Sequence, residues 1–160
     1  MVEKTNVMRI LDGKKIPYTA RTYEQDPSMT GEEIADLLGE EADRVFKTLV
    51  TRGRSGQFYV FLIPVTEELD LKKAAKASGE KDIAMIKQKE LLPLTGYVHG
   101  GCSPIGMKKS FPTFIQEDAE LYETIFVSAG KLGHQIEIAP EDLRDVTGCF
   151  STDLIKALQY

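Results

Sequence analysis

The sequence has no tryptophan and only two cysteines, Cys102 and Cys149, among its 160 residues. The two cysteines do not form a Cys-x-x-Cys pair, and no second cluster of ligand residues completes a tetrahedral zinc site. We therefore expect neither a disulfide nor a structural metal, and no residue pattern indicates a cofactor.

Long apolar runs are also missing. No segment approaches the roughly 20 apolar residues that a membrane helix needs, and the opening MVEKTNVMRILDGKK has no apolar stretch of signal-peptide length. These absences predict a soluble, cytoplasmic protein with no membrane partner. With 42% hydrophobic residues and no low-complexity linker, residues 1–160 are expected to form one domain with a single packed core.

Positive charge is not in excess, because 25 acidic residues oppose 20 basic ones and give a net charge of −5. This balance argues against non-specific coating of a nucleic-acid duplex, although it leaves room for a local basic site. The sequence also lacks the P-loop, HEXXH and GxSxG motifs, so nucleotide-triphosphatase, zinc-protease and serine-hydrolase functions have no support.

Helical spacing, caps and breakers predict several short helices. Thr30 with Glu33 three residues later forms a capping box, and Pro93 is expected to end its helix early. A further turn is expected over residues 40–44. The helical patterns cover residues 5–13, 30–39, 69–78, 87–92 and 140–148.

The β-rich segments alternate with these helices without a strict βαβ repeat. Residues 53–56, Gly-Arg-Ser-Gly, join two of them as a hairpin, and the near-continuous apolar run in residues 57–65 predicts a central strand covered on both faces. The tail at residues 151–158 fits either a helix or a terminal strand. The strand patterns cover residues 16–24, 46–52, 57–65, 83–85, 113–115, 123–128 and 134–138.

The resulting class is α/β or α+β, with a twisted mixed sheet flanked by helices. Within it, the stretch TGYVHGGCSPIGMKK carries adjacent glycines, Gly100 and Gly101, with Lys108 and Lys109 just beyond them. Bare backbone N–H groups in such a turn suit a phosphate or a developing oxyanion. The alternative is a tight turn between strands, since Gly-Gly and Ser-Pro are common in turns.

Single polar residues in apolar surroundings are further candidates for chemistry. Lys47 lies in the strand-forming run VFKTLV and needs an anionic partner if it points inward; on an exposed edge it needs none. Cys102 and His99 resemble a thiol and its base, but no residue is placed to orient the imidazole, and a packed cysteine more often acts as a small hydrophobe.

Three carboxylates complete the set of candidates, namely Asp26, Glu137 and Asp142. Asp142 follows Pro140 in the first turn of an expected helix, where an acidic side chain also serves as a cap. A structural role and a catalytic role therefore both stay open for it.

Five segments, taken together and in order, resemble the YbaK family of aminoacyl-tRNA deacylases, which is related to the editing domain inserted in bacterial prolyl-tRNA synthetases. The likeness extends over residues 6–150. The five segments are KIPYTARTYEQDP, VFKTLV, LDLKKAAKASG, TGYVHGGCSPIGMKK and VSAGKLGHQIEIAPEDL.

The resemblance implies a barrel-like mixed sheet and an editing site that deacylates Cys-tRNA(Pro) and Cys-tRNA(Cys). Catalytic positions carried over from the family are Lys47, Gly101, Tyr23 and Asp142. Substrate-binding positions are expected at Gly100, Ser103, Pro104, Tyr97 and Lys108. Tyr23 or Tyr97 would stack on a base of the acceptor end.

The implied chemistry needs no catalytic triad, because an aminoacyl ester is already activated and the substrate's own thiol is thought to attack its carbonyl. The implied partners are the acceptor end of tRNA and a prolyl-tRNA synthetase. Two alternatives stay open: the same fold editing another substrate such as Ala-tRNA(Pro), and a non-catalytic protein that binds tRNA or a synthetase.

Overall fold

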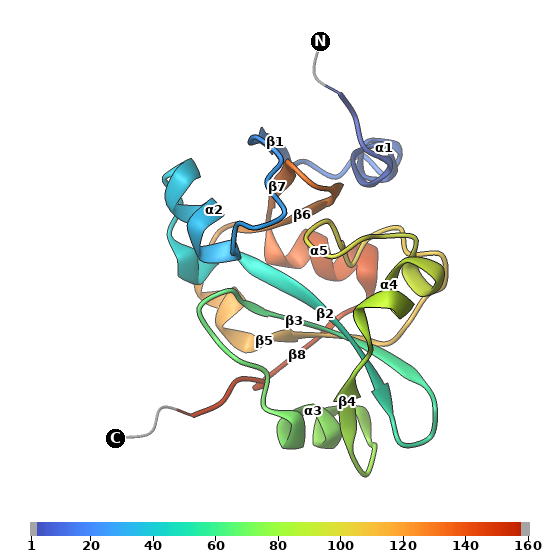
Figure 1. Ribbon diagram of the computed structural model, residues 1–160. Helices are drawn as coiled ribbons and strands as arrows, with labels where there is room; N and C mark the ends of the chain where they lie inside the picture. The colour runs from blue at the N-terminus through green and yellow to red at the C-terminus, as the bar shows by residue number, and fades with distance from the viewer. Residues whose placement is uncertain (1–2, 158–160) are drawn as a thin grey trace.

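A computed structural model describes residues 3–157 of the chain. Helices and strands alternate along it (Figure 1). The order is α1 (Asn6–Gly13), β1 (Thr19–Thr22), α2 (Gly31–Leu38), the 3₁₀ helix η1 (Ala42–Arg44), β2 (Phe46–Gly53), β3 (Phe58–Pro64), α3 (Leu71–Ser78), β4 (Ile83–Met85), α4 (Gln88–Thr95), β5 (Thr113–Gln116), the 3₁₀ helix η2 (Glu117–Leu121), β6 (Ile125–Lys131), β7 (His134–Ile138), α5 (Pro140–Thr147) and β8 (Phe150–Thr152).

The strands form two sheets. The larger has the order β4-β2-β3-β5-β8 and the smaller the order β1-β7-β6. β2 pairs antiparallel with β3, whereas β5 is parallel to both β3 and β8, so the mixed α+β class is confirmed. The barrel-like closure is not confirmed, because the described strands form two separate sheets and not one closed sheet.

β3 occupies the centre of the larger sheet, as its apolar sequence predicts. Val60 and Leu62 pack into the cluster shared with α1 and the smaller sheet, while Phe61 and Ile63 pack into a second cluster under α3. All four side chains are fully buried. Burial on both faces stabilises the strand by about 2 kcal/mol for each such side chain, before the entropy cost of ordering it.

The two sheets approach each other where β2 begins. An isolated parallel bridge joins Val45, just before β2, to Phe126 in β6. Beyond this bridge the two strands separate, β2 toward β3 and β4 and β6 toward its hairpin with β7. In Figure 1 the smaller sheet and α2 lie in the upper half, and β4 and α3 lie at the bottom. The separation leaves a fork between the sheets.

Most helix ends agree with the expected caps. The Thr5 side chain accepts from the N–H of Met8, and Thr30 and Glu33 make both reciprocal capping-box bonds. The turn expected over residues 40–44 is η1. The third helix begins at Leu71, not residue 69, because the carboxylate of Asp70 caps it.

Two expected elements exist, but their predicted ends were wrong. Pro93 lies inside α4, which continues to Thr95 and ends at Gly96 in the left-handed conformation; in so short a helix proline removes a single backbone bond. The hairpin strand expected at residues 123–128 is β6, which runs on to Lys131 through a bulge after Ser128.

Only the start of the tail is a strand: β8 adds to the edge of β5 and includes residues 151–152 of the tail. Residues 153–157 form neither a helix nor a strand, apart from an isolated bridge between Ile155 and Leu69. Residue 158 of that tail lies outside the described residues. Within residues 3–157 no helix combines the length and apolarity needed to cross a bilayer.

Candidate functional site

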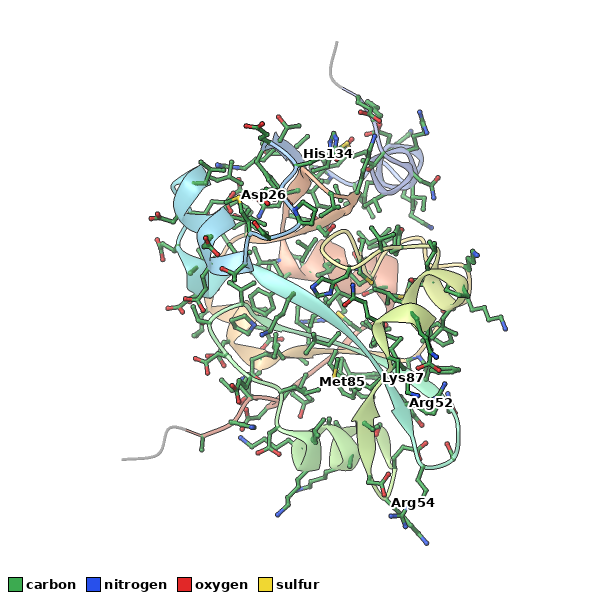
Figure 2. All side chains as sticks on the ribbon, in the orientation of Figure 1. Asp26, Arg52, Arg54, Met85, Lys87 and His134 are labelled. Carbon is green, nitrogen blue, oxygen red and sulfur yellow. The ribbon has the colours of Figure 1, made fainter. Side chains whose placement is uncertain are left out.

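A cavity of about 660 Å³ occupies the fork between the two sheets, and we call it the fork cavity. It extends from His134 on β7, in the upper part of Figure 2, to Met85 at the end of β4, in the lower half. Its walls are formed by residues 45–50, 30–32, 85–86, 127–128 and 134–135, together with Gly100. Segments distant in sequence therefore meet around one volume.

Lys47 lines the fork cavity from β2. Alternation along the strand places it on the face of Leu49, opposite the face that carries Phe46 and Val50 into the core. Residues 47–49 lie on an open strand edge, since β4 pairs from Thr51 onward and the N–H of Ile86, just after β4, donates to the Val50 carbonyl. The cavity surrounds this edge and so borders both faces of the strand.

The Lys47 ammonium has no carboxylate within 4 Å among the described residues. Burial lowers its pKa, and the more distant charges of Glu68 and Glu32 oppose that effect. A half-buried cation without a direct partner is placed to accept an anionic group of a ligand.

Thr48 lies on the other face of β2, toward the core that contains Cys102. Its side-chain oxygen is shielded from solvent and has no hydrogen-bond partner within residues 3–157. The N–H of Ile86 reaches the carbonyl of Val50 at 3.4 Å, so the edge of β2 closes only beyond Thr48. That oxygen is not accessible from the open volume of the fork cavity, so it offers a ligand there no contact.

The glycine turn forms the wall that faces the tip of the β6–β7 hairpin. Gly100 has φ of 85°, and a Cβ there would lie 2.8 Å from the Leu132 side chain. A Cβ on Gly101 would lie 3.0 Å from the backbone nitrogen of Leu132. Both positions therefore need glycine because the hairpin packs directly on the turn.

The amides of this turn differ in availability. Gly101 donates its N–H to the Val98 carbonyl at 2.9 Å, so that group closes the turn and cannot serve as the oxyanion donor. The N–H groups of Gly100 and Cys102, residues that line the fork cavity, have no acceptor within the described chain. Any oxyanion role therefore moves to these two neighbours.

Cys102 and His99 both line the fork cavity. The thiol is 8% exposed, and burial raises its pKa to about 12, with the Thr95 side chain opposing the shift. The imidazole of His99 lies in an exposed position. At neutral pH Cys102 therefore stays a thiol and packs as a small apolar side chain.

Tyr23 follows β1 and lines the same cavity. Its backbone N–H donates to Gly133 at 2.9 Å, and burial raises the pKa of its phenol. The phenol thus stays neutral. Tyr23 is the aromatic residue among the expected positions that borders the fork cavity.

Several expected positions do not border the fork cavity. Tyr97 is buried and its hydroxyl donates to the Ile105 carbonyl, so it cannot stack on a base. Ser103 is fully buried and accepts from the N–H of Ile105 at 3.2 Å. Pro104 borders a separate hollow of about 160 Å³ on the other side of the loop.

Lys108 and Asp142 also lie outside the lining of the fork cavity. The stem of Lys108 packs over Gly96, and its N–H donates to Thr95 at 3.0 Å. Asp142 lies in the first turn of α5, a helix that contributes no residue to the fork cavity. No side chain caps α5 by a hydrogen bond, but the place of Asp142 in the first turn agrees with the structural alternative, in which the helix dipole stabilises the carboxylate.

The other two carboxylates have structural partners. Asp26 accepts from the backbone and hydroxyl of Ser28 in an exposed turn. Glu137 lies between Arg21 at 3.4 Å and Arg44 at 3.3 Å and also accepts from Thr124 at 2.5 Å. Among the described residues, no three His, Cys, Asp or Glu side chains are grouped closely enough to hold a metal ion.

Sequence reasoning missed the polar row on the smaller sheet. Ser128 and Gln135 pair across β6 and β7, and both line the fork cavity. In HQIEI the glutamine falls on the polar side of an alternating pattern, which predicts solvent exposure. Gln135 is instead 4% exposed. The sequence did contain one signal for this row: Ser128 and Gln135 are polar residues at facing positions of the predicted hairpin.

Comparison with known proteins identifies the family of this chain. Residues 25–146 match the model of the aminoacyl-tRNA editing domain. The chain is 50% identical to "Putative Cys-tRNA(Pro)/Cys-tRNA(Cys) deacylase EbsC" of Enterococcus faecalis, covering 91% of this chain and 89% of that protein. It is 26% identical to a proline–tRNA ligase of Fervidobacterium nodosum over 62% of this chain and 17% of the ligase.

A solved structure described as "a putative trans-editing enzyme for prolyl tRNA synthetase" superposes with a TM-score of 0.79 at 25% identity, covering 97% of this chain and all of that one. The family match spans most of the chain, including β2, the glycine turn and the β6–β7 hairpin that form the fork cavity. The chain belongs to the aminoacyl-tRNA editing domain family.

Proposed function

We propose that this protein is a trans-editing deacylase that cleaves the aminoacyl ester of Cys-tRNA(Pro) and of Cys-tRNA(Cys). One observation carries the proposal: residues that line the fork cavity include Lys47, whose ammonium has no carboxylate partner within residues 3–157, and Gly100 and Cys102, whose amides have no acceptor there. The printed name of the half-identical relative and the family match support the substrate class.

The acceptor end of tRNA would enter as a single strand. Lys47 supplies a positive charge for a phosphate, and Tyr23 offers a neutral aromatic face for a base. We expect the ester then to lie beside the glycine turn, because residues of β2 and of this turn line the same cavity. A volume of about 660 Å³ suits an aminoacylated nucleoside.

The fork cavity itself offers no strong nucleophile, since burial keeps Cys102 protonated. The cysteine of the substrate can fill that role. Its sulfur attacks the ester carbonyl carbon, the bond to the ribose oxygen breaks, and the thiol proton passes to that oxygen, leaving free tRNA and a cyclic thioester. Intramolecular attack gains about 7 kcal/mol or more from proximity.

The negative net charge of the protein affects how strongly it can bind tRNA. A net charge of −5 gives little general attraction for a polyanion. We infer that a prolyl-tRNA synthetase holds the mischarged tRNA while the acceptor end reaches the fork cavity in the cytoplasm. The similarity to part of a proline–tRNA ligase supports a shared substrate.

A deacylation panel tests the proposal. tRNA(Pro) charged with Cys, Ala or Ser is incubated with the wild-type protein, and ester loss and the released product are measured. We expect rapid loss of Cys and slow loss of Ala and Ser, with a cyclic thioester formed first. Loss of Ala but not Cys would assign the site to alanine, and no loss of any ester would show a non-catalytic binder.

The same panel includes Lys47→Ala, with Lys72→Ala as the matched control because Lys72 is exposed on α3, away from the fork cavity. Removing one charge-assisted contact is expected to lower kcat/KM for Cys-tRNA(Pro) about tenfold or more. Equal rates for the two lysine variants would remove Lys47 from the site.

A further inference from the structure

The open edge of β2 presents main-chain groups to the fork cavity. In the β2–β3 hairpin, Val65 donates its N–H to the Val45 carbonyl at 2.8 Å, and Gly53 donates to the Gln57 carbonyl at 2.8 Å. The main-chain N–H and C=O groups of successive residues in an antiparallel strand point to alternate edges. The odd-numbered residues of β2 therefore face β3, and the N–H and C=O of Thr48 face the opposite edge.

No strand of the described chain covers this edge at Thr48. The last hydrogen bond between β2 and the β4 segment runs from the N–H of Ile86 to the Val50 carbonyl at 3.4 Å. Hydrogen-bonded pairs recur at every second residue of an antiparallel ladder, so the next pair would join Thr48 to Gln88. The chain instead turns into α4 at Gln88, directly after β4 (Figure 1). Both main-chain groups of Thr48 are thus left without a partner within residues 3–157.

The fork cavity reaches the main chain at this point. Residues 45–50 all line it, although their side chains alternate between the two faces of the strand. The edge is the part of the strand that both faces share, so the cavity borders the main chain there. Thr48 is half-buried while its hydroxyl is shielded from solvent, so its accessible surface belongs to its other atoms.

A donor and an acceptor of one residue, side by side on an open edge, select a ligand that carries the complementary pair. Phosphate and ester oxygens only accept hydrogen bonds, and an α-ammonium group only donates them. Adenine has both on one edge, because its N6 amine donates and the ring nitrogens beside it accept. The aminoacyl ester of a charged tRNA is attached to the terminal adenosine, so adenine is the base closest to the reacting group.

Apolar side chains surround the same part of the fork cavity. Ile86, directly after β4, and Leu91 on α4 both line it and are half-buried. Such surroundings exclude water, which strengthens hydrogen bonds, and they suit the faces of a base. A base uses its edge for hydrogen bonds and its face for stacking, so an edge contact at Thr48 is compatible with stacking on Tyr23.

We propose that the main chain of Thr48 recognises the terminal adenine of the substrate. Its C=O accepts a hydrogen bond from the N6 amine, and its N–H donates to a neighbouring ring nitrogen. Adenine thereby takes the position along β2 that a longer β4 would occupy. The inference rests on the proposed deacylase function and adds the means by which the site holds the nucleoside that carries the ester.

The test changes only the base of the substrate. tRNA(Pro) ending in adenosine or in purine riboside, which lacks the N6 amine, is charged with cysteine. The wild-type protein is expected to prefer the adenosine form about tenfold or more in kcat/KM, because purine leaves the Thr48 carbonyl without a donor. Terminal 1-deazaadenosine and 7-deazaadenosine each lack one ring nitrogen, and one of the two is expected to lower kcat/KM by a similar factor. The uncatalysed rate of each ester is subtracted.

A proline variant tests the protein side. Thr48→Pro removes the N–H and fills the edge with the proline ring, yet it breaks no bond to β3. Its preference for adenosine over purine riboside is expected to fall to about one. Ala20→Pro is the matched control, because Ala20 is exposed on the open edge of β1, away from the fork cavity. Its N–H faces outward, since Tyr23 donates toward β7 at Gly133, and its preference should equal that of the wild type.

The outcomes separate the two proposals. If the wild-type protein cleaves the adenosine and purine riboside forms at equal rates, or if a folded Thr48→Pro keeps the full preference, the inference is wrong while the deacylase function stands. If no form is cleaved, the proposed function itself fails. Thermal unfolding confirms that each variant is folded, and the substrate comparison in the wild-type protein decides the inference without any variant.

Discussion

Cys102 illustrates how one residue type carries different meanings in different surroundings. It stands in the glycine turn three residues after His99, which looks like a nucleophile and its base. Burial raises its pKa to about 12, so the thiolate is scarce at neutral pH. The residue contributes packing, and the reactive thiol of the proposed reaction belongs to the substrate.

The variant Cys102→Ala tests this assignment. We expect its rate of Cys-tRNA(Pro) deacylation to lie within about twofold of the wild type, with stability lower by about 1 kcal/mol from the lost buried sulfur. Cys149→Ala is the control, because Cys149 is equally buried but does not line the fork cavity. A fall to the uncatalysed rate in Cys102→Ala alone would make Cys102 the nucleophile.

Individual site residues could be predicted where the signal came from their neighbours in the sequence, and not where it came from residues distant in the sequence. Lys47 stood out because a charge interrupts an apolar strand, and it lines the fork cavity. Gln135 did not, because alternation in a strand predicts a solvent-facing polar residue and cannot show that Glu40, just after α2, lies against it. Asp142 was predicted from a family pattern, and the favourable interaction of a first-turn carboxylate with the helix dipole explains its position as well.

At the scale of elements, the glycine turn and the β6–β7 hairpin act as one unit. The backbone at Lys131 and Leu132 lies within 3.4 Å of where a Cβ on Gly101 would be. This wall of the fork cavity thus depends on a direct contact between two backbone segments. A larger residue at Gly101 could not be accommodated by a side-chain rotation, because the neighbouring atoms belong to the backbone.

Gly101→Ala is expected to lower the free energy of unfolding by about 1–3 kcal/mol, because the hairpin tip must move away. Deacylation should fall with it, since the amides of Gly100 and Cys102 would shift. Gly13→Ala is the control: nothing lies within 4 Å of a Cβ there, and alanine at the end of a helix is neutral or stabilising. Chemical denaturation measures both, and equal stabilities would contradict the close contact.

Elements with strong local signals were predicted correctly, whereas the exact ends of α4 and β6 and the choice between helix and strand in the tail depend on tertiary pairing. The capping box of α2 and the apolar run of β3 depend on residues near in sequence. The tail at β8 fits helix and strand alike, and the parallel edge of β5 decides between them. The length of β6 and the survival of α4 past Pro93 likewise depend on partners distant in sequence.

At the scale of the whole molecule, buried and half-buried carboxylates respond to pH in opposite directions. Thr124 and the two arginines lower the pKa of Glu137, so its stabilising effect is present above the unfolded pKa of about 4.3 and is lost as pH falls through the lower folded value. Burial raises the pKa of Glu40, so its contribution to stability falls as pH rises from the unfolded to the folded value.

We therefore expect Glu137→Gln to lower the free energy of unfolding at pH 7 by roughly 1–2 kcal/mol and to lose less stability than the wild type between pH 5 and pH 3. Glu40→Gln should show the reverse trend, gaining relative to the wild type as pH rises above about 4.3. Urea unfolding across this range measures both. Parallel pH curves for the two variants would contradict the opposite signs.

The pairing of β1 with β7 joins Thr19–Thr22 to a strand more than 110 residues later in the chain. During synthesis the first half can form α2 and the β2–β3 hairpin, but Gln135 and the hairpin that supports the glycine turn are translated afterwards. A nascent chain released before β7 would therefore have the lysine without the opposite wall. Such a truncated product would lack an enclosed site that could retain the acceptor end of tRNA. Premature termination should therefore give an inactive fragment and not an enzyme of reduced activity.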